Sequence, residues 1–315
     1  MRQTLPEIPR LDQPFPVLLH PETAAVHRET LAWSEATGLL GPEHTERLDR
    51  QRIGWLTGYT APGATRAGLR LCADWSLVLY GVDDGYCDEG DFGARTTDMA
   101  RMCGRLTRLL DDPHQTVPDA GRCATALGDV RLRVAESGTP AQLDRWCAAV
   151  RDYLAALVWE ASHRATGEIP GLGDYLALRE SGSAVHTVLN LLDLAGGYEV
   201  PAADWLDPSL VRLRRLIAHV VGWDNDLYSY AKELADTRAV NNLVTVLARH
   251  HDIPVAEAVT VLVGMHDRAI EGIRAECRAL AAGEPHPDTL RYAKTILHWV
   301  SGNTAFSFES TRYQG

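Results

Sequence analysis

Apolar residues recur along most of this chain at spacings of three and four positions, and few stretches alternate apolar and polar residues as strands do. Proline and glycine interrupt the pattern and divide it into segments of helical length. Several segments begin with residues that suit a first helical turn, among them Thr139-Pro140 and Asp207-Pro208. The predicted helices span residues 22–39, 43–58, 66–88, 94–111, 120–137, 140–165, 172–194, 208–235, 238–250, 254–282 and 286–308. The pattern therefore predicts an all-α protein.

The helical segments follow one another without a long break. No serine- and glycine-rich linker, charge block or internal repeat divides the chain, although 315 residues are enough for one or two domains. We therefore predict one α-helical domain over residues 1–315, a bundle of roughly ten or more helices, with a proline-rich segment at residues 1–21.

Composition narrows the classes of partner. The formal net charge of −11 argues against a nucleic-acid partner, and an anionic substrate would need local cations or a metal. No apolar run approaches the length of a membrane span, and the amino terminus lacks the apolar core of a secretory signal. The six cysteines form no CxxC pair, which favours reduced thiols. We expect a cytoplasmic protein without stable membrane insertion; a homodimer is compatible with the sequence.

A first acidic cluster follows the most apolar predicted helix. Residues 69–82 are apolar nearly all round, and the sequence DDGYCDEGD comes next. Carboxylates near a core are costly unless they are paired or bind metal, and the helix dipole opposes negative charge at this end. The cluster is either a solvated loop or a site for a divalent cation, whose preferred ligands are oxygens.

A second group of oxygen-bearing side chains follows a single helical face. Asn225, Ser229 and Glu233 recur every four positions, which keeps them on one stripe. Taken alone, such a trio can simply face water. Two oxygen-rich clusters on two buried helices instead indicate metal ions held between them, which bridge an anionic ligand.

These residues resemble the motifs of a known family, the bacterial class I terpene synthases. DDGYCDE resembles the aspartate-rich motif, and NDLYSYAKE matches every specified position of the NSE motif, (N/D)Dxx(S/T)xx(K/R)E. Arg179 lies where these enzymes carry a diphosphate-sensing arginine, Lys232 occupies the basic position of the NSE motif, and Arg312-Tyr313 resembles the terminal RY pair. The resemblance implies the class I terpenoid synthase fold, in which a single catalytic domain of helices surrounds a central cavity. It also implies three Mg²⁺ ions and a prenyl diphosphate substrate.

The resemblance also implies roles for individual residues. It assigns Asp83, Asp88, Asn225, Ser229 and Glu233 to the metal ions. Four residues would bind the diphosphate, namely Arg179, Lys232, Arg312 and Tyr313. On an undistorted helix Asp84 and Asp88 share a face, so Asp83 can be the ligand only if the helix ends or bends near Gly85; Asp84 is then a supporting acid.

The carbocation that follows ionisation would need a dry, apolar cavity. Aromatic faces stabilise cations without attacking them. The candidates are Trp55, Trp75, Tyr80, Trp299 and Phe306.

Two positions depart from the family pattern. Gly182 stands where many relatives carry an acidic linker beside the effector position, here Ser183, and glycine predicts a helix break that frees carbonyl groups toward the cavity. Phe306 stands where a tryptophan is common. We expect a cavity shaped differently from those of relatives.

The resemblance favours farnesyl diphosphate as the substrate, with cyclisation to a sesquiterpene and release of diphosphate, because DDGYCDE resembles motifs of bacterial sesquiterpene cyclases and also of some monoterpene-type ones. Geranyl, methylgeranyl and C20 diphosphates are the alternatives within the same fold. A chain-elongating synthase would carry a second DDxxD, and a protonation-initiated cyclase would carry DxDD; neither is present. An HD-type metal phosphohydrolase could use His219, His251-Asp252 and His266-Asp267. A non-enzymatic helical binding module leaves both oxygen clusters unexplained.

Overall fold

The computed structural model describes residues 9, 11, 13–83, 91–115, 117, 121–235 and 241–311, without the side chains of residues 91, 232 and 235. The first half contains α1 (Thr23–Thr37), α2 (Pro42–Arg50), α3 (Gly54–Thr60), α4 (Arg66–Val82), the 3₁₀ helix η2 (Asp91–Ala94), α5 (Thr96–Asp111), α6 (Cys123–Ser137) and α7 (Pro140–Thr166). The second half contains α8 (Leu172–Gly182), α9 (Val185–Leu189), α10 (Leu192–Ala195), α11 (Ala202–Trp205), α12 (Pro208–Ala235), α13 (Leu243–His251), α14 (Val255–Ala282) and α15 (Pro287–Glu309). Over these described ranges no strand is formed, which confirms the all-α prediction.

Two predicted helices are wrong because the backbone breaks inside them. The segment 43–58 forms α2 and α3, and Arg52 between them takes a positive φ of 54°. The segment 172–194 forms α8, α9 and α10, and Ala184 after α8 has a φ of 58°. Side chains with a Cβ rarely adopt this conformation, so neither residue signals a break in the sequence.

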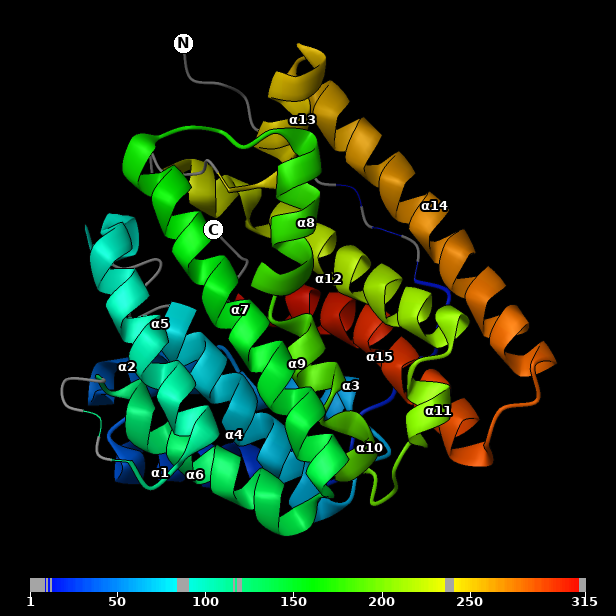
Figure 1. Cartoon of the computed structure of the whole chain (residues 1–315). Helices are drawn as coiled ribbons and strands as arrows, with labels where there is room; N and C mark the ends of the chain where they lie inside the picture. The colour runs from blue at the N-terminus through cyan, green and yellow to red at the C-terminus, as the bar shows by residue number, and fades with distance from the viewer. Residues whose placement is uncertain are drawn as a thin grey trace.

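The helices surround the centre of a single all-α domain (Figure 1). The long helix α12 packs against α14 and α15, and α15 also packs against α3. On the other side, α7 packs against α5, α8 and α9, while α4 packs against α1 and α6. None of the described helices is long and apolar enough to cross a membrane. The extents of the domain, 1–315, and of the amino-terminal segment, 1–21, stay predictions.

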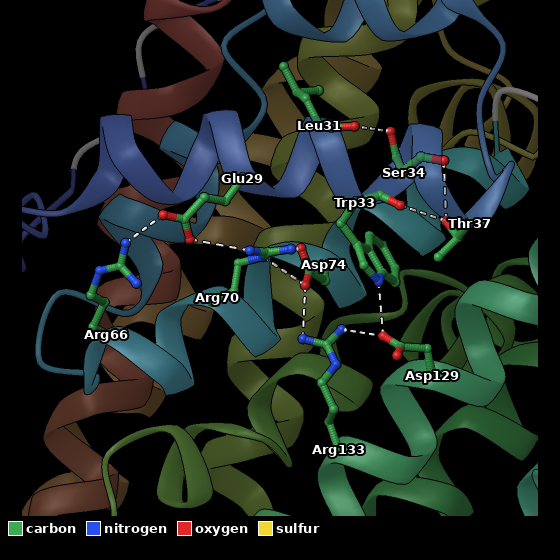
Figure 2. A network of polar contacts seen from close by, with 10 residues as sticks. All are labelled: Glu29, Leu31, Trp33, Ser34, Thr37, Arg66, Arg70, Asp74, Asp129 and Arg133. Atoms are coloured by element: carbon green, nitrogen blue, oxygen red, sulfur yellow. Dashed lines mark hydrogen bonds and ion pairs between the residues drawn. The ribbon is translucent and has the colours of Figure 1, made fainter.

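Helix α4, which leads to the first acidic cluster, is fixed by a polar network with α1 and α6 (Figure 2). The carboxylate of Asp74 is fully buried, and both its oxygens accept hydrogen bonds of 2.8 Å from Arg70 Nε. Arg133 Nη1 on α6 donates to Asp74 Oδ2 at 2.9 Å. Arg70 Nη1 also reaches Glu29 of α1 at 3.2 Å, and Arg133 reaches Asp129 at 2.9 Å. The two guanidinium groups compensate a carboxylate that burial would otherwise make costly.

The start of α4 lies directly against α10. The Thr65 hydroxyl caps the helix by accepting a 3.0 Å hydrogen bond from Gly68 N, and Thr65 N donates to Ala195 O at 2.8 Å. A Cβ at Gly68 would lie 2.2 Å from Ala195 O, so only glycine permits this approach. The cap and the glycine together fix where α4 begins.

Candidate active site

A cavity of about 260 Å³ lies between α4, α7, the α8–α9 segment, α12 and α15. One part of its wall is polar, with side chains from α4, α7, α8 and α12. Another part is apolar, with Leu56, Leu79, Val188 and Val221. A polar region beside an apolar one suits a ligand that has a charged end and a hydrocarbon body.

The oxygen stripe of α12 faces this cavity. Asn225 and Glu233 both line it, and Asp83, the residue after α4, lines it from another side. Ser229 lies between Asn225 and Glu233 along α12 and is buried. Its hydroxyl donates to Glu233 Oε1 at 2.5 Å. Asn242 Nδ2 donates to Glu233 Oε2 at 2.9 Å. The structure therefore brings Asp83, Asn225 and Glu233 to one cavity, with Ser229 bonded to Glu233.

Arg179 of α8 contacts the same end of the stripe. Its Nη2 donates to Asn225 Oδ1 at 2.9 Å and to Gly222 O at 3.3 Å, and it lies 2.8 Å from Asp226 Oδ1. The Arg179 side chain is only 15% exposed and lines the cavity. A buried guanidinium held by a carboxylate and an amide is a fixed cation at the polar end of the site.

Asp226 is the main residue that the sequence reasoning missed, although it lies inside NDLYSYAKE. It lines the cavity, and the hydroxyl of Tyr175 and the backbone N–H of Leu243 donate to its Oδ2, the latter at 3.2 Å. Burial raises the pKa of Asp226 to about 7, which the positive charge of Arg179 opposes. Because Asp226 contacts both Arg179 and Tyr175, it anchors α8 to α12.

Helix α8 ends beside the cavity, where Gly182 in the sequence predicts a helix break. Helix α8 ends at Gly182, and Ser183 and the left-handed Ala184 follow; all three line the cavity. A Cβ at Gly182 would lie 2.5 Å from Glu160 Oε1 of α7. Glu160, which the sequence reasoning also missed, therefore approaches α8 closely because position 182 has no side chain.

Of the aromatic residues predicted to line the cavity, the structure places only some in its wall. Tyr80 and Trp299 line the cavity, but Trp55, Trp75 and Phe306 are not among its described lining residues. Trp75 is used in the core instead, where its Nε1 donates to Thr187 at 2.8 Å and its ring meets Trp146 edge-on. The Trp55 ring lies under the guanidinium of Arg52, at 4.1 Å. Phe306 is 1% exposed and belongs to the core.

Some predicted site residues lie outside the described residues. They are Asp84, Asp88, Arg312 and Tyr313, together with the side chain of Lys232.

The histidines proposed for a phosphohydrolase do not form a metal site. His266 is fully buried, and its Nδ1 lies 2.8 Å from Asp224 Oδ1, so it forms a structural pair between α12 and α14. The ring of His219 stacks on Trp223, and His251 is exposed at the end of α13. Within the described part of the chain, no three His, Cys, Asp or Glu side chains gather around a metal position.

The donors at the cavity do fit a hard cation. Asp83 and Glu233 offer carboxylate oxygens, Asn225 an amide oxygen and Ser229 a hydroxyl, and such oxygens are the ligands that Mg²⁺ takes. Mg²⁺ also keeps open positions for water or phosphate oxygens, so few protein ligands are enough.

Comparison with known proteins agrees with the geometry. Residues 74–271 match the model of the family described as terpene synthase family 2, C-terminal metal binding. The chain is 34% identical to 4-epi-cubebol synthase ((2E,6E)-farnesyl diphosphate cyclizing) of Streptosporangium roseum, over 97% of this chain and 92% of that protein. It is 32% identical to (+)-(1(10)E,4E,6S,7R)-germacradien-6-ol synthase of Streptomyces pratensis, over 98% of this chain and 86% of that protein. The solved structure of wild-type cucumene synthase superposes with a TM-score of 0.82 at 26% identity, covering 95% of this chain and 100% of that one. The chain therefore belongs to the terpene synthase family of enzymes.

Proposed function

We propose that this terpene synthase ionises farnesyl diphosphate in the cavity, cyclises the farnesyl cation and releases diphosphate. The observation that carries the proposal is the convergence of Asp83, Asn225, Glu233 and Arg179 on one cavity that continues into an apolar wall. A diphosphate needs the polar end, and a prenyl chain needs the apolar one. Relatives whose names specify farnesyl diphosphate cyclisation support the C15 substrate.

The polar end would hold three Mg²⁺ ions, with Asp83 and Asp88 on one side and Asn225, Ser229 and Glu233 on the other. When bound, these ions neutralise the charge that develops on the leaving diphosphate. The residues of α12 are suited to holding such an ion because they offer one carboxylate and two neutral oxygens. A cation with few negative ligands stays electrophilic toward the diphosphate. Ser229 and Asn242 keep the Glu233 carboxylate oriented by a hydrogen bond to each oxygen.

Arg179 would donate hydrogen bonds to the diphosphate, together with Lys232, Arg312 and Tyr313. In the structure its guanidinium bonds Asn225 Oδ1, an oxygen that a metal ion would also use. Occupation of the site would then release Arg179 from Asn225, while Asp226 keeps the arginine at the cavity. Substrate binding would in this way change the hydrogen-bond partners of Arg179 while α8 stays anchored by Asp226.

The apolar region would fold the prenyl chain and keep water from the cation. Tyr80 and Trp299 present aromatic rings to the cavity, which can stabilise positive charge. The break at Gly182 and Ser183 brings backbone groups to the same wall. A homodimer and a cytoplasmic location stay predictions.

The substrate is tested by incubating the enzyme and Mg²⁺ with C10, C15 and C20 prenyl diphosphates and analysing the extracts by gas chromatography and mass spectrometry. We expect cyclic C15 products from farnesyl diphosphate as the main activity. Release of diphosphate from none of the three would refute the proposal, and turnover of only the C10 or C20 substrate would refute the chain length.

The ligand assignment is tested with Asn225→Ala and Glu233→Ala. Both should abolish turnover and leave the helical circular dichroism unchanged. Trp55→Phe is a matched control, because Trp55 lies outside the described cavity wall, and it should retain activity. Full activity in both α12 variants would contradict the assignment.

A further inference from the structure

A second cavity lies on the opposite side of the α8–α9 segment from the active-site cavity. Its volume is about 330 Å³, and its walls come from α7, α8, α9, α11 and α12. Glu180, Ser181 and His186 line this second cavity, whereas their neighbours Arg179 and Gly182 line the active-site cavity. The α8–α9 segment therefore separates the active-site cavity from the second cavity.

The wall of the second cavity carries a buried cation that forms no ion pair, although the Asp193 carboxylate attracts it at longer range. Arg214 of α12 is 8% exposed, and within the described residues no carboxylate lies within ion-pair distance of it. Its Nη2 donates to Trp205 O at 3.1 Å, but its Nη1 is buried and makes no hydrogen bond to any described group. The guanidinium stacks on the Trp205 ring at 3.9 Å, and burial lowers the pKa of Arg214.

The other charges of this wall are largely matched among themselves. Arg145, which lies over Trp205 at 4.0 Å, pairs with Asp193 at 3.0 Å. Arg215 pairs with Glu180 at 3.2 Å, and Glu180 also contacts His186 at 3.3 Å and His219 at 3.7 Å. Asp152 lines the cavity too, but it is exposed to solvent.

These pairs leave the charge of Arg214 only partly compensated beside the second cavity, because Asp193, which attracts it, is already paired with Arg145. A buried charge without a partner is costly, and a guanidinium is the side chain best suited to bind carboxylate or phosphate oxygens. Arg145 lies over the same indole ring, but Asp193 at 3.0 Å and Glu199 at 3.8 Å already match its charge, so Arg214 is the cation that a bound anion would complement.

We propose that this second cavity, defined by Arg145, Trp205, Arg214 and Arg215, is an accessory site for a small oxyanion, either a phosphate or a carboxylate group. The anion lies against the outer face of the α8–α9 segment and compensates Arg214. It is distinct from the substrate diphosphate, which the proposed function places on the other side of that segment.

The test measures anion binding to the full-length enzyme in the presence of EDTA, so that no metal-dependent binding in the active site contributes. Inorganic phosphate is titrated in one arm and acetate in the other, at matched ionic strength with chloride as the reference, and binding is followed by isothermal titration calorimetry. We expect at least one of the two anions to bind with one site per chain. The arm that binds more tightly identifies the oxyanion class.

The site is located with variants on two elements. Arg214→Gln removes the charge of Arg214 and should weaken binding at least tenfold. Because Arg214 is buried and its replacement can unfold the protein, a second variant places a carboxylate at the cavity from an exposed position: Ala148→Glu on α7. We expect Ala148→Glu to weaken binding tenfold or more by charge repulsion, and Ala148→Gln, of the same size and neutral, to leave it within threefold of wild type.

Two results would overturn the proposal. One is the absence of binding by either anion above the chloride reference. The other is binding that Ala148→Glu leaves unchanged, which would place the anion elsewhere, for example at Arg179. Neither result bears on turnover of farnesyl diphosphate, so failure of this proposal and failure of the proposed function are distinguishable.

Discussion

Asp74→Ala tests whether the buried network of Figure 2 stabilises the helix that leads to the metal motif. The change removes a fully buried carboxylate and leaves Arg70 and Arg133, which are 22% and 28% exposed, without it. Breaking a buried ion pair in this way costs about 3–5 kcal/mol. Because Arg70 keeps Glu29 and Arg133 keeps Asp129, the lower end, about 3 kcal/mol, applies.

This energy converts to a shift in Tm. The entropy of unfolding is about 2.1 cal/mol/K per residue, or about 0.66 kcal/mol/K for 315 residues. A loss of about 3 kcal/mol therefore lowers Tm by about 5 °C. Thermal unfolding followed by circular dichroism measures the shift.

Glu46→Ala is the matched control, because Glu46 also pairs with an arginine four residues away, Arg50, at 2.9 Å. Both partners of that pair are about two-thirds exposed, so its loss should change Tm by less than about 1 °C. If Asp74→Ala lowers Tm no more than Glu46→Ala does, the network does not stabilise α4 as argued.

Three further changes probe other parts of the structure. Gly68→Ala should lower Tm by about 2–5 °C, because the added Cβ would meet the backbone of α10; an unchanged Tm would show that the two helices separate easily. Trp299→Leu should alter the ratio of products in gas chromatography without weakening Mg²⁺-dependent diphosphate binding, and an unchanged profile would remove Trp299 from the cavity wall. Hydrogen bonds and charge from His186 and Arg215 lower the pKa of Glu180 to about 2, below its ordinary value of 4.5. This group therefore contributes stability above pH 4.5 that is lost as the pH falls toward 2. Glu180→Gln should lower the urea midpoint at neutral pH, with a difference from wild type that shrinks over this window; a difference independent of pH would contradict the pairing.

The sequence predicts elements well where a local signal marks where they begin. Helix α12 was predicted at 208–235 and spans Pro208–Ala235. Its start is marked by Asp207, whose side chain accepts hydrogen bonds from Ser209 N at 2.8 Å and Leu210 N at 3.2 Å. The break at Arg52 carries no such signal, because tertiary packing imposes the positive φ on a residue that ordinarily avoids it. The break at Ala184 is marked only by the nearby Gly182, and Ala184 itself gives no sign of its positive φ. The short helix α11 was missed because four residues are too few to show a period.

In the candidate site, too, the features that depend on local spacing could be predicted and those that depend on distant residues could not. The spacing of Asn225, Ser229 and Glu233 is local, so the stripe could be read from the sequence. The contacts of Asp226 with Arg179 and Tyr175 join residues far apart in the chain, and no local pattern contains them. Buried aromatic residues show the same periodicity whether they line a cavity or fill the core. Trp75 and Trp299 therefore could not be told apart before their neighbours were known.

The central claim is that the α12 stripe helps to hold metal ions that bind a diphosphate. Isothermal titration of the enzyme with inorganic diphosphate, with Mg²⁺ and then with EDTA, tests it most directly when wild type is compared with Glu233→Gln. This substitution keeps the size of the side chain and removes its charge. We expect tight binding by the wild type only with Mg²⁺, and at least tenfold weaker binding by Glu233→Gln at an unchanged Tm. Binding that is the same with and without Mg²⁺, or the same in both proteins, would contradict it.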